Sequence, residues 1–290
     1  MKFDKNTKIL IVGLGLIGGS YAKALSDEGY FVGAIDKKKS SVEYALKNGL
    51  IQVGETSVKK DFVKDFDLIV FALYLHDFIN WIKENQSSIK SGALITDVTG
   101  VKSFVVENVQ KILRGDLEFV GAHPMAGKEV SGVENADPKI FVGANYIVTP
   151  TKKNTDENVQ AVKDLGRALG FERISSLSPE EHDETVGFLS HLTHCIAVSL
   201  MVSKKSHHLA EYTGDSFRDL TRIAKINDEM WSELFLANKD ELLKQMDLFE
   251  EKFNQLKEDI KNDNREKIRE TLRESTARRK VFDKDAKETK

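Results

Sequence analysis

A glycine-rich turn near the amino terminus constrains the fold more than any other stretch of the chain. It has the pattern G-x-G-x-x-G over residues 13–18 and directly follows the apolar run Lys8–Val12, which predicts a buried strand. The residues after it have helical character, and Tyr30–Ile35 then predicts a second strand that leads to Asp36. Strand, glycine turn, helix, strand and acidic residue in this order are typical of a βαβ unit that binds a dinucleotide.

Each residue of the turn has a physical reason to be there. Gly13 makes the tight turn, Gly15 lets the backbone approach a pyrophosphate, and Gly18 lets helix and strand pack closely. The helix that follows the turn presents its N-terminus to the phosphate charge, and Leu16 and Ile17 lie in the turn that leads into it. We therefore expect all five residues to bind the cofactor.

Asp36 is the residue that selects between the two nicotinamide cofactors. Its carboxylate would accept hydrogen bonds from the ribose hydroxyls and repel a 2′-phosphate, which favours NAD. Three lysines, Lys37, Lys38 and Lys39, follow at once, and one of them could bind a 2′-phosphate instead. NADP therefore stays open as the less favoured cofactor.

Strand and helix patterns continue to alternate as far as residue 177. This alternation predicts an α/β fold with a doubly wound, mostly parallel Rossmann-type sheet. From Pro179 onward there is no strand pattern, so we expect a dinucleotide-binding domain over 1–177 and an all-helical substrate and dimerisation domain over 178–290. The further predicted strands are Asp67–Ala72, Ala93–Thr96, Glu118–Ala122, Tyr146–Thr149 and Phe171–Ser176.

Two apolar surfaces in the helical region are expected to be buried against another helix or a second chain. Thr185–Val202 is apolar nearly all round, which is typical of a buried helix. A second stretch, from Leu242 to Ile260, carries apolar residues at alternating steps of four and three, which is a seam for packing helix on helix. We predict a homodimer built from the helical domains; the alternative is that the two surfaces cover each other within one chain.

Composition excludes several other classes of protein. The net charge of −3 argues against nucleic acid as a main partner. We find no apolar run of about 20 residues that would span a bilayer, and the polar first seven residues give no sign of a signal peptide. The single cysteine, Cys195, cannot form an internal disulfide, so we expect a cytoplasmic protein.

His123 is the leading candidate for acid–base chemistry. It follows the predicted strand, and Pro124 and two small residues then turn the chain. The imidazole is therefore expected at the carboxyl end of a sheet strand, where open α/β sheets bind their ligands, and it can take a proton near neutral pH. The alternative is a histidine that only bonds a carbonyl at the end of the strand.

Five blocks in one order resemble the prephenate dehydrogenase family, over roughly residues 8–260. They are Gly13–Ser20, the loop Asp97–Lys102 (similar to D-x-x-S-x-K), His123–Gly127 with Glu129, Glu181–His194 (similar to a helix with S-H-L-P-H), and Phe217–Ala224 with Met230 and Trp231. The family oxidises and decarboxylates prephenate in tyrosine biosynthesis, with hydride transfer to a nicotinamide. The resemblance implies that His123 bonds the substrate hydroxyl and that Arg222 holds a substrate carboxylate, for which a fork of donors is suited. It also implies that His194, Trp231 and Glu129 edge the substrate pocket.

The sequence departs from the family at Gly100, Lys128 and Thr193, and the first of these bears on His123. The loop serine thought to hydrogen-bond the catalytic histidine falls at Gly100, and Thr99 could supply the hydroxyl if the turn is shifted. Arg222 could also form only a structural ion pair with Asp219, one helical turn back.

Two alternatives of function stay open. One is arogenate dehydrogenase, with the same chemistry, and another is a non-catalytic NAD(P)-sensing protein of the same fold. We predict no metal site, because His191 and His194 lie one helical turn apart but show no third ligand.

Overall fold

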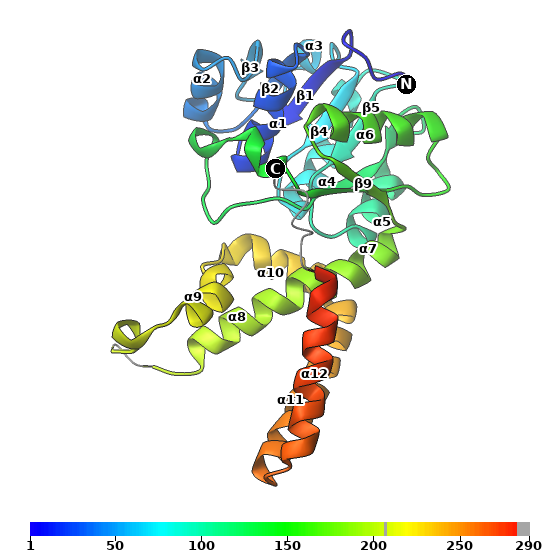
Figure 1. The fold of residues 1–290 in the computed structure, drawn as a ribbon. Helices are drawn as coiled ribbons and strands as arrows, with labels where there is room; N and C mark the ends of the chain where they lie inside the picture. The colour runs from blue at the N-terminus through cyan, green and yellow to red at the C-terminus, as the bar shows by residue number, and fades with distance from the viewer. Residues whose placement is uncertain (206–207, 283–290) are drawn as a thin grey trace. The chain divides into compact units, whose positions relative to one another are not determined.

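Six parallel strands form the main sheet of the computed structural model, which describes residues 1–205 and 208–282 (Figure 1). Their spatial order is β3-β2-β1-β4-β5-β6. This order confirms the predicted doubly wound Rossmann-type sheet, to which β3 adds a strand that the sequence analysis missed. The strands are β1 (Lys8–Val12), β2 (Phe31–Ile35), β3 (Val53–Glu55), β4 (Leu68–Phe71), β5 (Leu94–Asp97) and β6 (Glu118–Phe119).

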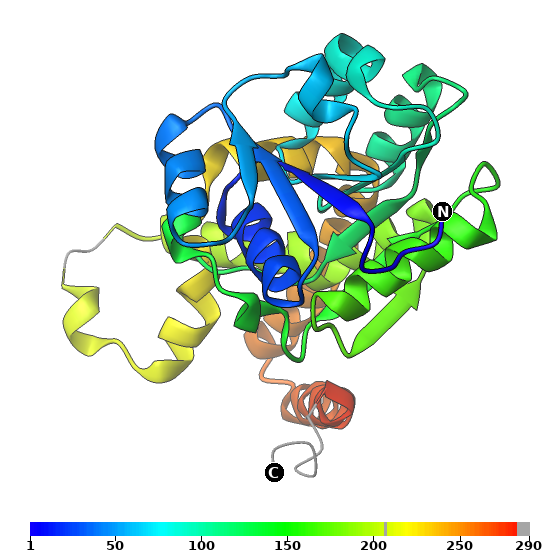
Figure 2. The same cartoon turned by 90° about the horizontal axis from the view of Figure 1, so that it is seen from above.

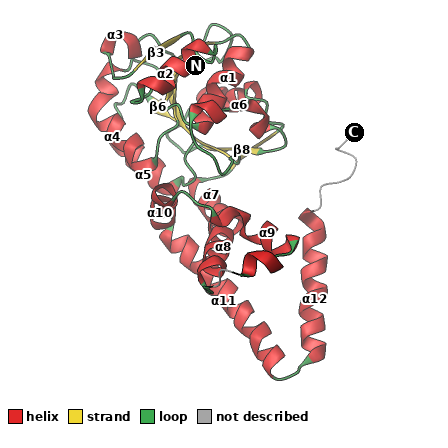
Figure 3. Cartoon of the chain, turned by 90° about the vertical axis from the view of Figure 1, so that its left-hand side faces the viewer, coloured by secondary structure: helices red, strands yellow, loops and turns green. Residues whose placement is uncertain are grey.

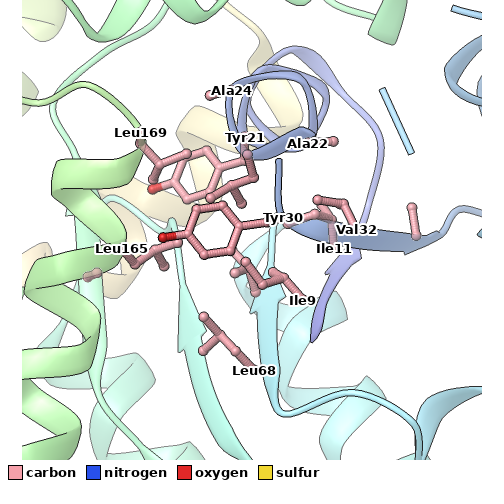
Figure 4. Close-up of a cluster of buried hydrophobic side chains, with 14 of the residues drawn as sticks. Ile9, Ile11, Tyr21, Ala22, Ala24, Tyr30, Val32, Leu68, Leu165 and Leu169 are labelled. Atoms are coloured by element: carbon pink, nitrogen blue, oxygen red, sulfur yellow. The ribbon is translucent and has the colours of Figure 1, made fainter. Parts of the chain in front are cut away.

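Both faces of this sheet are covered by helices, because successive apolar side chains of each strand point to opposite faces. Ile9 and Ile11 of β1 join one cluster with α1 (Leu16–Asp27), α2 (Lys39–Lys47) and α6 (Asp156–Ala168) (Figure 4). The alternate β1 residues join the other cluster, with α3 (Lys60–Val63), α4 (Leu75–Asn85) and α5 (Ser103–Ile112). Figure 2 shows α1 and α6 on one side of the strands and the cyan helices on the other.

A second, three-stranded sheet lies beyond β6, and this differs from the single sheet that we expected. It consists of β7 (Gly121–Pro124), β8 (Asn145–Thr149) and β9 (Arg173–Ser176). β7 is antiparallel to β8, and β8 is parallel to β9. The predicted strand Glu118–Ala122 is thus divided between two sheets, because the chain leaves the first sheet after Val120 and enters the second at Gly121.

One long helix follows the two sheets, as the loss of strand pattern predicted. It consists of α7 (Pro179–Val186), a π-helical turn η4 (Gly187–Leu192) and α8 (Thr193–Val202). Ser178 begins it with a capping box, in which its hydroxyl bonds the Glu181 backbone N–H and the Glu181 carboxylate bonds the Ser178 N–H. Shorter helices follow, namely η5 (Leu209–Tyr212), α9 (Asp215–Thr221), η6 (Arg222–Ala224) and α10 (Asp228–Ala237).

The long helix is less buried than its composition predicted. Its first half is buried on one side, but the last turn of its second half is exposed in the single chain, including Leu200, Met201 and Val202. By length and composition, Pro179–Val202 is also apolar enough to cross a membrane, which corrects our expectation that no such run exists. A core helix of a soluble protein passes the same test, and this helix carries His182, Asp183 and His191 on its buried side.

The chain packs as two units, Met1–Lys239 and Asp240–Lys290. The second contains most of α11 (Lys239–Lys261), then α12 (Arg265–Arg279) and η7 (Lys280–Phe282) (Figure 3). The predicted seam lies on α11, where Phe249 and Phe253 stack with ring centroids 5.9 Å apart and are exposed in the single chain. The predicted boundary at residues 177/178 lies inside the first unit and stays a prediction about domains.

Candidate active site

The glycine turn has the geometry that a dinucleotide cradle requires. Gly13 has φ of +98°, and a Cβ there would lie 2.4 Å from the carbonyl oxygen of Ala72. A Cβ on Gly18 would lie 1.9 Å from the Gly13 carbonyl oxygen, so α1 can pack this closely on the turn only with glycine there. Gly15 precedes α1, meets nothing within 4 Å, and leaves the helix N-terminus open to an anion. The residues present therefore fit a pyrophosphate over the N–H groups at Leu16 and Ile17.

Asp36 lies directly after β2, beside the glycine turn. One carboxylate oxygen accepts a hydrogen bond from the Leu14 N–H at 2.7 Å, and the other accepts from the Lys38 N–H at 2.7 Å. These two bonds hold the carboxylate in place at the edge of the turn. Lys38 thus contacts Asp36 through its backbone, which orients the carboxylate without bringing the lysine ammonium to it.

His123 lies inside β7 rather than after a strand of the main sheet. It pairs with Ile147 of β8, so the strand continues through Pro124 and the turn comes later than we predicted. The strand can include Pro124, which has no N–H to donate, because β7 is an edge strand of the second sheet. The imidazole is half-buried.

A chain of two hydrogen bonds joins His123 to a buried carboxylate. His123 Nδ1 lies 2.8 Å from His182 Nε2, and His182 Nδ1 lies 2.8 Å from Asp183 Oδ1. The Asp183 carboxylate also accepts from the backbone N–H groups of Lys102, at 2.7 Å, and Ser103, at 2.8 Å. Sequence reasoning placed His182 and Asp183 in a family-like block but gave them no role. The sequence signal that could have identified them is a histidine next to an aspartate, on a predicted helix that carries two further histidines.

This chain determines which nitrogen of His123 can act as a base. The Asp183 carboxylate only accepts, so His182 Nδ1 carries the proton and His182 Nε2 accepts from His123 Nδ1–H. His123 Nε2 is then left with a free lone pair. A Cβ built on Gly100 would lie 3.7 Å from that nitrogen, so Nε2 faces the Gly100 loop.

Burial keeps these imidazoles neutral. It holds the pKa of His123 well below 6.5, and the nearby His182, Lys102 and His191 lower it further. Burial likewise lowers the pKa of His182, although the hydrogen bond to Asp183 opposes this. By itself burial would raise the pKa of Asp183, but its bonds from His182 and from backbone N–H groups bring it below its usual value. His123 is therefore a free base at neutral pH.

Thr99 does not orient His123, so that prediction is wrong. The Thr99 hydroxyl bonds the Asp97 carboxylate, lies 3.1 Å from the Val101 carbonyl oxygen, and accepts from Lys102 Nζ at 3.0 Å. Thr99 is buried, and these contacts with Asp97, Val101 and Lys102 occupy its hydroxyl. His182 takes the orienting role instead.

The π-helical turn holds another buried histidine, His191, which Asn238 links to the backbone of Asp183. Asn238 Nδ2 donates to the Asp183 backbone carbonyl at 2.9 Å and lies 3.2 Å from His191 Nδ1. The extra residue of a π-turn rotates the rest of the helix, so the buried side passes from His182 and Val186 to His191 and Leu192. Burial lowers the pKa of His191 to about 4.

The remaining predicted site residues form two contacts in the same unit. Arg222 pairs with Glu129, and not with Asp219, through its guanidinium. His194 lies on Trp231 with ring centroids 3.7 Å apart, and its Nδ1 donates to the Ser190 carbonyl at 2.8 Å. Trp231 belongs to α10.

Helix α10 links this cluster to the base. A Cβ on Gly100 would contact Leu234 of α10 at 3.5 Å as well as His123 at 3.7 Å. Trp231 and Leu234 lie three residues apart, on one side of the helix. The indole that stacks on His194 is therefore one helical turn from Leu234, which like His123 lies next to Gly100.

A cavity elsewhere in the structure does not belong to this site. A cavity of about 770 Å³ is lined by α5, by residues 150–152 and by the start of α7, and contains none of the predicted site residues. Within residues 1–205 and 208–282, no three His, Cys, Asp or Glu side chains are grouped to hold a metal ion. The expectation of a metal-free site stays a prediction.

Known proteins resemble this chain along most of its length. Residues 21–173 match the family model of the prephenate dehydrogenase nucleotide-binding domain, and residues 178–274 match that of its dimerization domain. Prephenate dehydrogenase of Bacillus subtilis is 35% identical over 249 residues, 82% of this chain and 66% of that protein. Prephenate dehydrogenase of Lactococcus lactis is 32% identical over 257 residues, 86% of this chain and 70% of that protein. This chain thus spans about two thirds of the length of these two curated relatives.

A solved structure extends the likeness to three dimensions. Prephenate dehydrogenase from Aquifex aeolicus, in complex with hydroxyphenyl propionate and NAD⁺, superposes with a TM-score of 0.87 at 34% identity, over 96% of this chain and 98% of that one. Two family models, two relatives above 30% identity and a shared fold point to the same family. They agree with the hydrogen-bonded chain His123–His182–Asp183 and with the glycine turn at 13–18. The chain belongs to the prephenate dehydrogenase family.

Proposed function

We propose that this chain catalyses the oxidative decarboxylation of prephenate to 4-hydroxyphenylpyruvate and carbon dioxide, with NAD as the hydride acceptor. The observation that carries the proposal is the relay of hydrogen bonds from Asp183 through His182 to His123, which leaves one basic nitrogen, His123 Nε2, in the nucleotide-binding domain. Family membership makes the chain an oxidoreductase, and the two curated relatives above 30% identity are both prephenate dehydrogenases. These names favour prephenate over arogenate.

His123 Nε2 would accept the proton of the substrate hydroxyl as the carbon that bears it is oxidised. Bound NAD supplies the hydride acceptor. The carboxylate on the ring leaves as carbon dioxide, and its bonding electrons make the ring aromatic. The new phenolate oxygen can recover the proton from His123, so the reaction requires no other acid.

The relay stabilises the imidazolium that forms during this transfer. A proton on His123 Nε2 makes Nδ1–H a stronger donor to His182, and His182 in turn donates to the Asp183 carboxylate. Asp183 keeps its charge, because three donors surround it. The carboxylate thus acts through orientation and charge, as a third group behind a base.

Arg222, His194, Trp231 and Glu129 are the proposed substrate-binding residues. The Arg222 guanidinium has five donors, of which the Glu129 carboxylate can use at most two, so it has donors left for a substrate carboxylate. Because His194 Nδ1–H donates a hydrogen bond to the Ser190 carbonyl, His194 Nε2 is left as an acceptor. The Trp231 ring supplies an apolar wall.

For the cofactor, Asp36 and the glycine turn support NAD. The Asp36 carboxylate is held at the turn by two backbone N–H groups, where a ribose would meet negative charge. A 2′-phosphate at the same place would be repelled.

For assembly and location, we propose a cytoplasmic homodimer that is formed through residues 178–274. The family model for this stretch is a dimerization domain, and the exposed apolar side chains of the long helix would be covered by a second copy. Neither nucleic acid nor membrane is a proposed partner.

NADH absorbance tests the function directly. Purified protein is given prephenate or arogenate, each with NAD or NADP, and the initial rate is measured. We expect the highest kcat/KM with prephenate and NAD, and a strong loss in the His123→Asn variant, which serves as the matched control. A higher kcat/KM with arogenate would assign the chain to the alternative substrate, and NAD binding with no turnover on either would indicate a sensing protein.

A further inference from the structure

A strand changes sheets immediately before the catalytic histidine. Val120 N–H still donates to the Ile95 carbonyl of β5, at 3.0 Å, as the ladder of the main sheet requires. Two residues later, the Ala122 N–H donates instead to a side chain, Asp97 Oδ1, at 3.0 Å. The backbone ladder between β5 and this strand therefore stops at Val120, and side chains take its place.

Asp97 is the acceptor that replaces the ladder. It is the last residue of β5 and is fully buried. Besides Ala122 N–H on Oδ1, its Oδ2 accepts from the Thr99 N–H at 3.0 Å, from the Thr99 hydroxyl and from Lys102 Nζ at 2.6 Å. One carboxylate thus holds the end of β5, the following loop and the switching strand together.

Lys102 is the matching donor. Its side chain is fully buried and its Nζ donates to Asp97 at 2.6 Å, to Thr99 Oγ1 at 3.0 Å and to the Ala122 carbonyl at 2.6 Å. An ammonium has three donors, and here each has an acceptor. The side chain passes beside Gly121, where a Cβ would lie 3.4 Å from Lys102 Cδ and 2.5 Å from Thr149 Oγ1, so only glycine leaves room at the switch.

From these contacts we propose that Asp97 and Lys102 are positioning residues for His123, which they aim by holding both the N–H and the carbonyl of Ala122. The proposal rests on the function proposed above. Neither residue needs to touch substrate or cofactor, because they act through the backbone of the residue that precedes the base. Lys102 also holds the second end of the relay, since its own backbone N–H bonds Asp183 at 2.7 Å.

The same pair contributes to the charge around the base. The titratable groups around His123 are His182 and Asp183 of α7, His191 of the π-turn, Asp97 at the end of β5 and Lys102 of the loop that follows it. The Lys102 charge lowers the pKa of His123, so removing this charge alone leaves Asp97 unbalanced and should raise that pKa. Removing both charges should change it much less.

Two variants separate the positioning role from the charge. Lys102→Met should lower kcat about 10- to 100-fold, because a small misplacement of a base can cost that much, and should move the acid limb of the kcat/KM profile to higher pH. The double variant Asp97→Asn with Lys102→Met should keep the acid limb near that of the wild type while kcat stays low, because the Ala122 carbonyl still lacks its donor. NAD affinity should stay within about threefold in both, since the glycine turn is untouched.

A control variant and a measurement that needs no turnover complete the design. Lys90→Met removes an ion pair with Asp67 elsewhere in the same unit and should leave kcat and the pH profile unchanged. The imidazole of His123, followed by NMR as pH is varied, should titrate at higher pH in Lys102→Met whether or not prephenate is the substrate. Should Lys102→Met fail to fold because it buries an unpaired carboxylate, the neutral double variant decides. A folded double variant with wild-type kcat, or an unshifted His123 titration in folded Lys102→Met, would overturn the proposal.

Discussion

Replacing His182 by asparagine or by glutamine separates the two hydrogen bonds that its imidazole makes. Nδ1 donates to Asp183 and Nε2 accepts from His123, each at 2.8 Å. An asparagine amide reaches only the position of Nδ1, so it can donate to Asp183 but offers His123 no acceptor. A glutamine amide reaches the position of Nε2, so its oxygen can accept from His123 Nδ1–H. The two variants differ by one methylene and therefore test the acceptor itself.

The expected loss follows from what the missing bond does during proton transfer. With asparagine, His123 Nδ1–H has no partner when the imidazole becomes charged, and a hydrogen bond to a charged group is worth about 1.5–3 kcal/mol. At about 1.4 kcal/mol for each factor of ten, kcat/KM should fall roughly 10- to 150-fold. Glutamine restores the acceptor but not the link to the carboxylate, so we expect a loss of about tenfold or less.

The assay is the rate of NADH formation with prephenate, measured as kcat and KM for both variants and the wild type. NAD affinity, measured by calorimetry, is the control for folding, because the glycine turn and Asp36 do not contact His182. Equal losses in the two variants would show that the acceptor at Nε2 is not what matters. An asparagine variant within threefold of wild type would refute the relay.

Four further outcomes follow from the geometry. Asp36→Ala should lower kcat/KM with NAD and narrow its advantage over NADP, as measured with both cofactors; a wild type that prefers NADP tenfold would contradict the assignment. His123→Asn should lower kcat by a factor of about 10² to 10⁴ and leave NAD binding nearly unchanged. Because the pKa of His123 is lowered, wild-type kcat/KM should fall with decreasing pH only below pH 6.5. A fall that begins above pH 6.5 would contradict the role of His123 as the base. The pKa of His191 is about 4 in the folded protein and about 6.5 in the unfolded chain, so the unfolded chain takes up the proton first as pH falls. The free energy of unfolding, measured by denaturant titration, should therefore fall by about 3 kcal/mol between pH 6.5 and pH 4. The His191→Gln variant should lose less stability over the same range. By light scattering, the wild type should have about twice the chain mass of 32.6 kDa. The double variant Phe249→Asp with Phe253→Asp should have half the mass of the wild type, or its helical domain should unfold. A soluble, active and dimeric double variant would show that this surface is not buried.

The sequence by itself determined the nucleotide-binding half of the fold. Short apolar runs rich in β-branched residues, such as that within Lys8–Val12, favour strands buried on both faces, and the glycine turn with Asp36 fits one local structure. These signals are local, because each depends on residues close together in the chain. For the same reason His123 could be proposed as the base from its own block of sequence.

The partners of His123 were decided only by the tertiary structure. His182 lies 59 residues away and Asp183 bonds backbone groups 80 residues away, and no periodicity encodes such contacts. Thr99 was a reasonable local candidate, but its hydroxyl is held by Asp97 and Lys102, which gather there because a strand changes sheets at Gly121. A strand that changes sheets leaves its backbone groups without a ladder, and only the packed structure shows which buried side chains satisfy them.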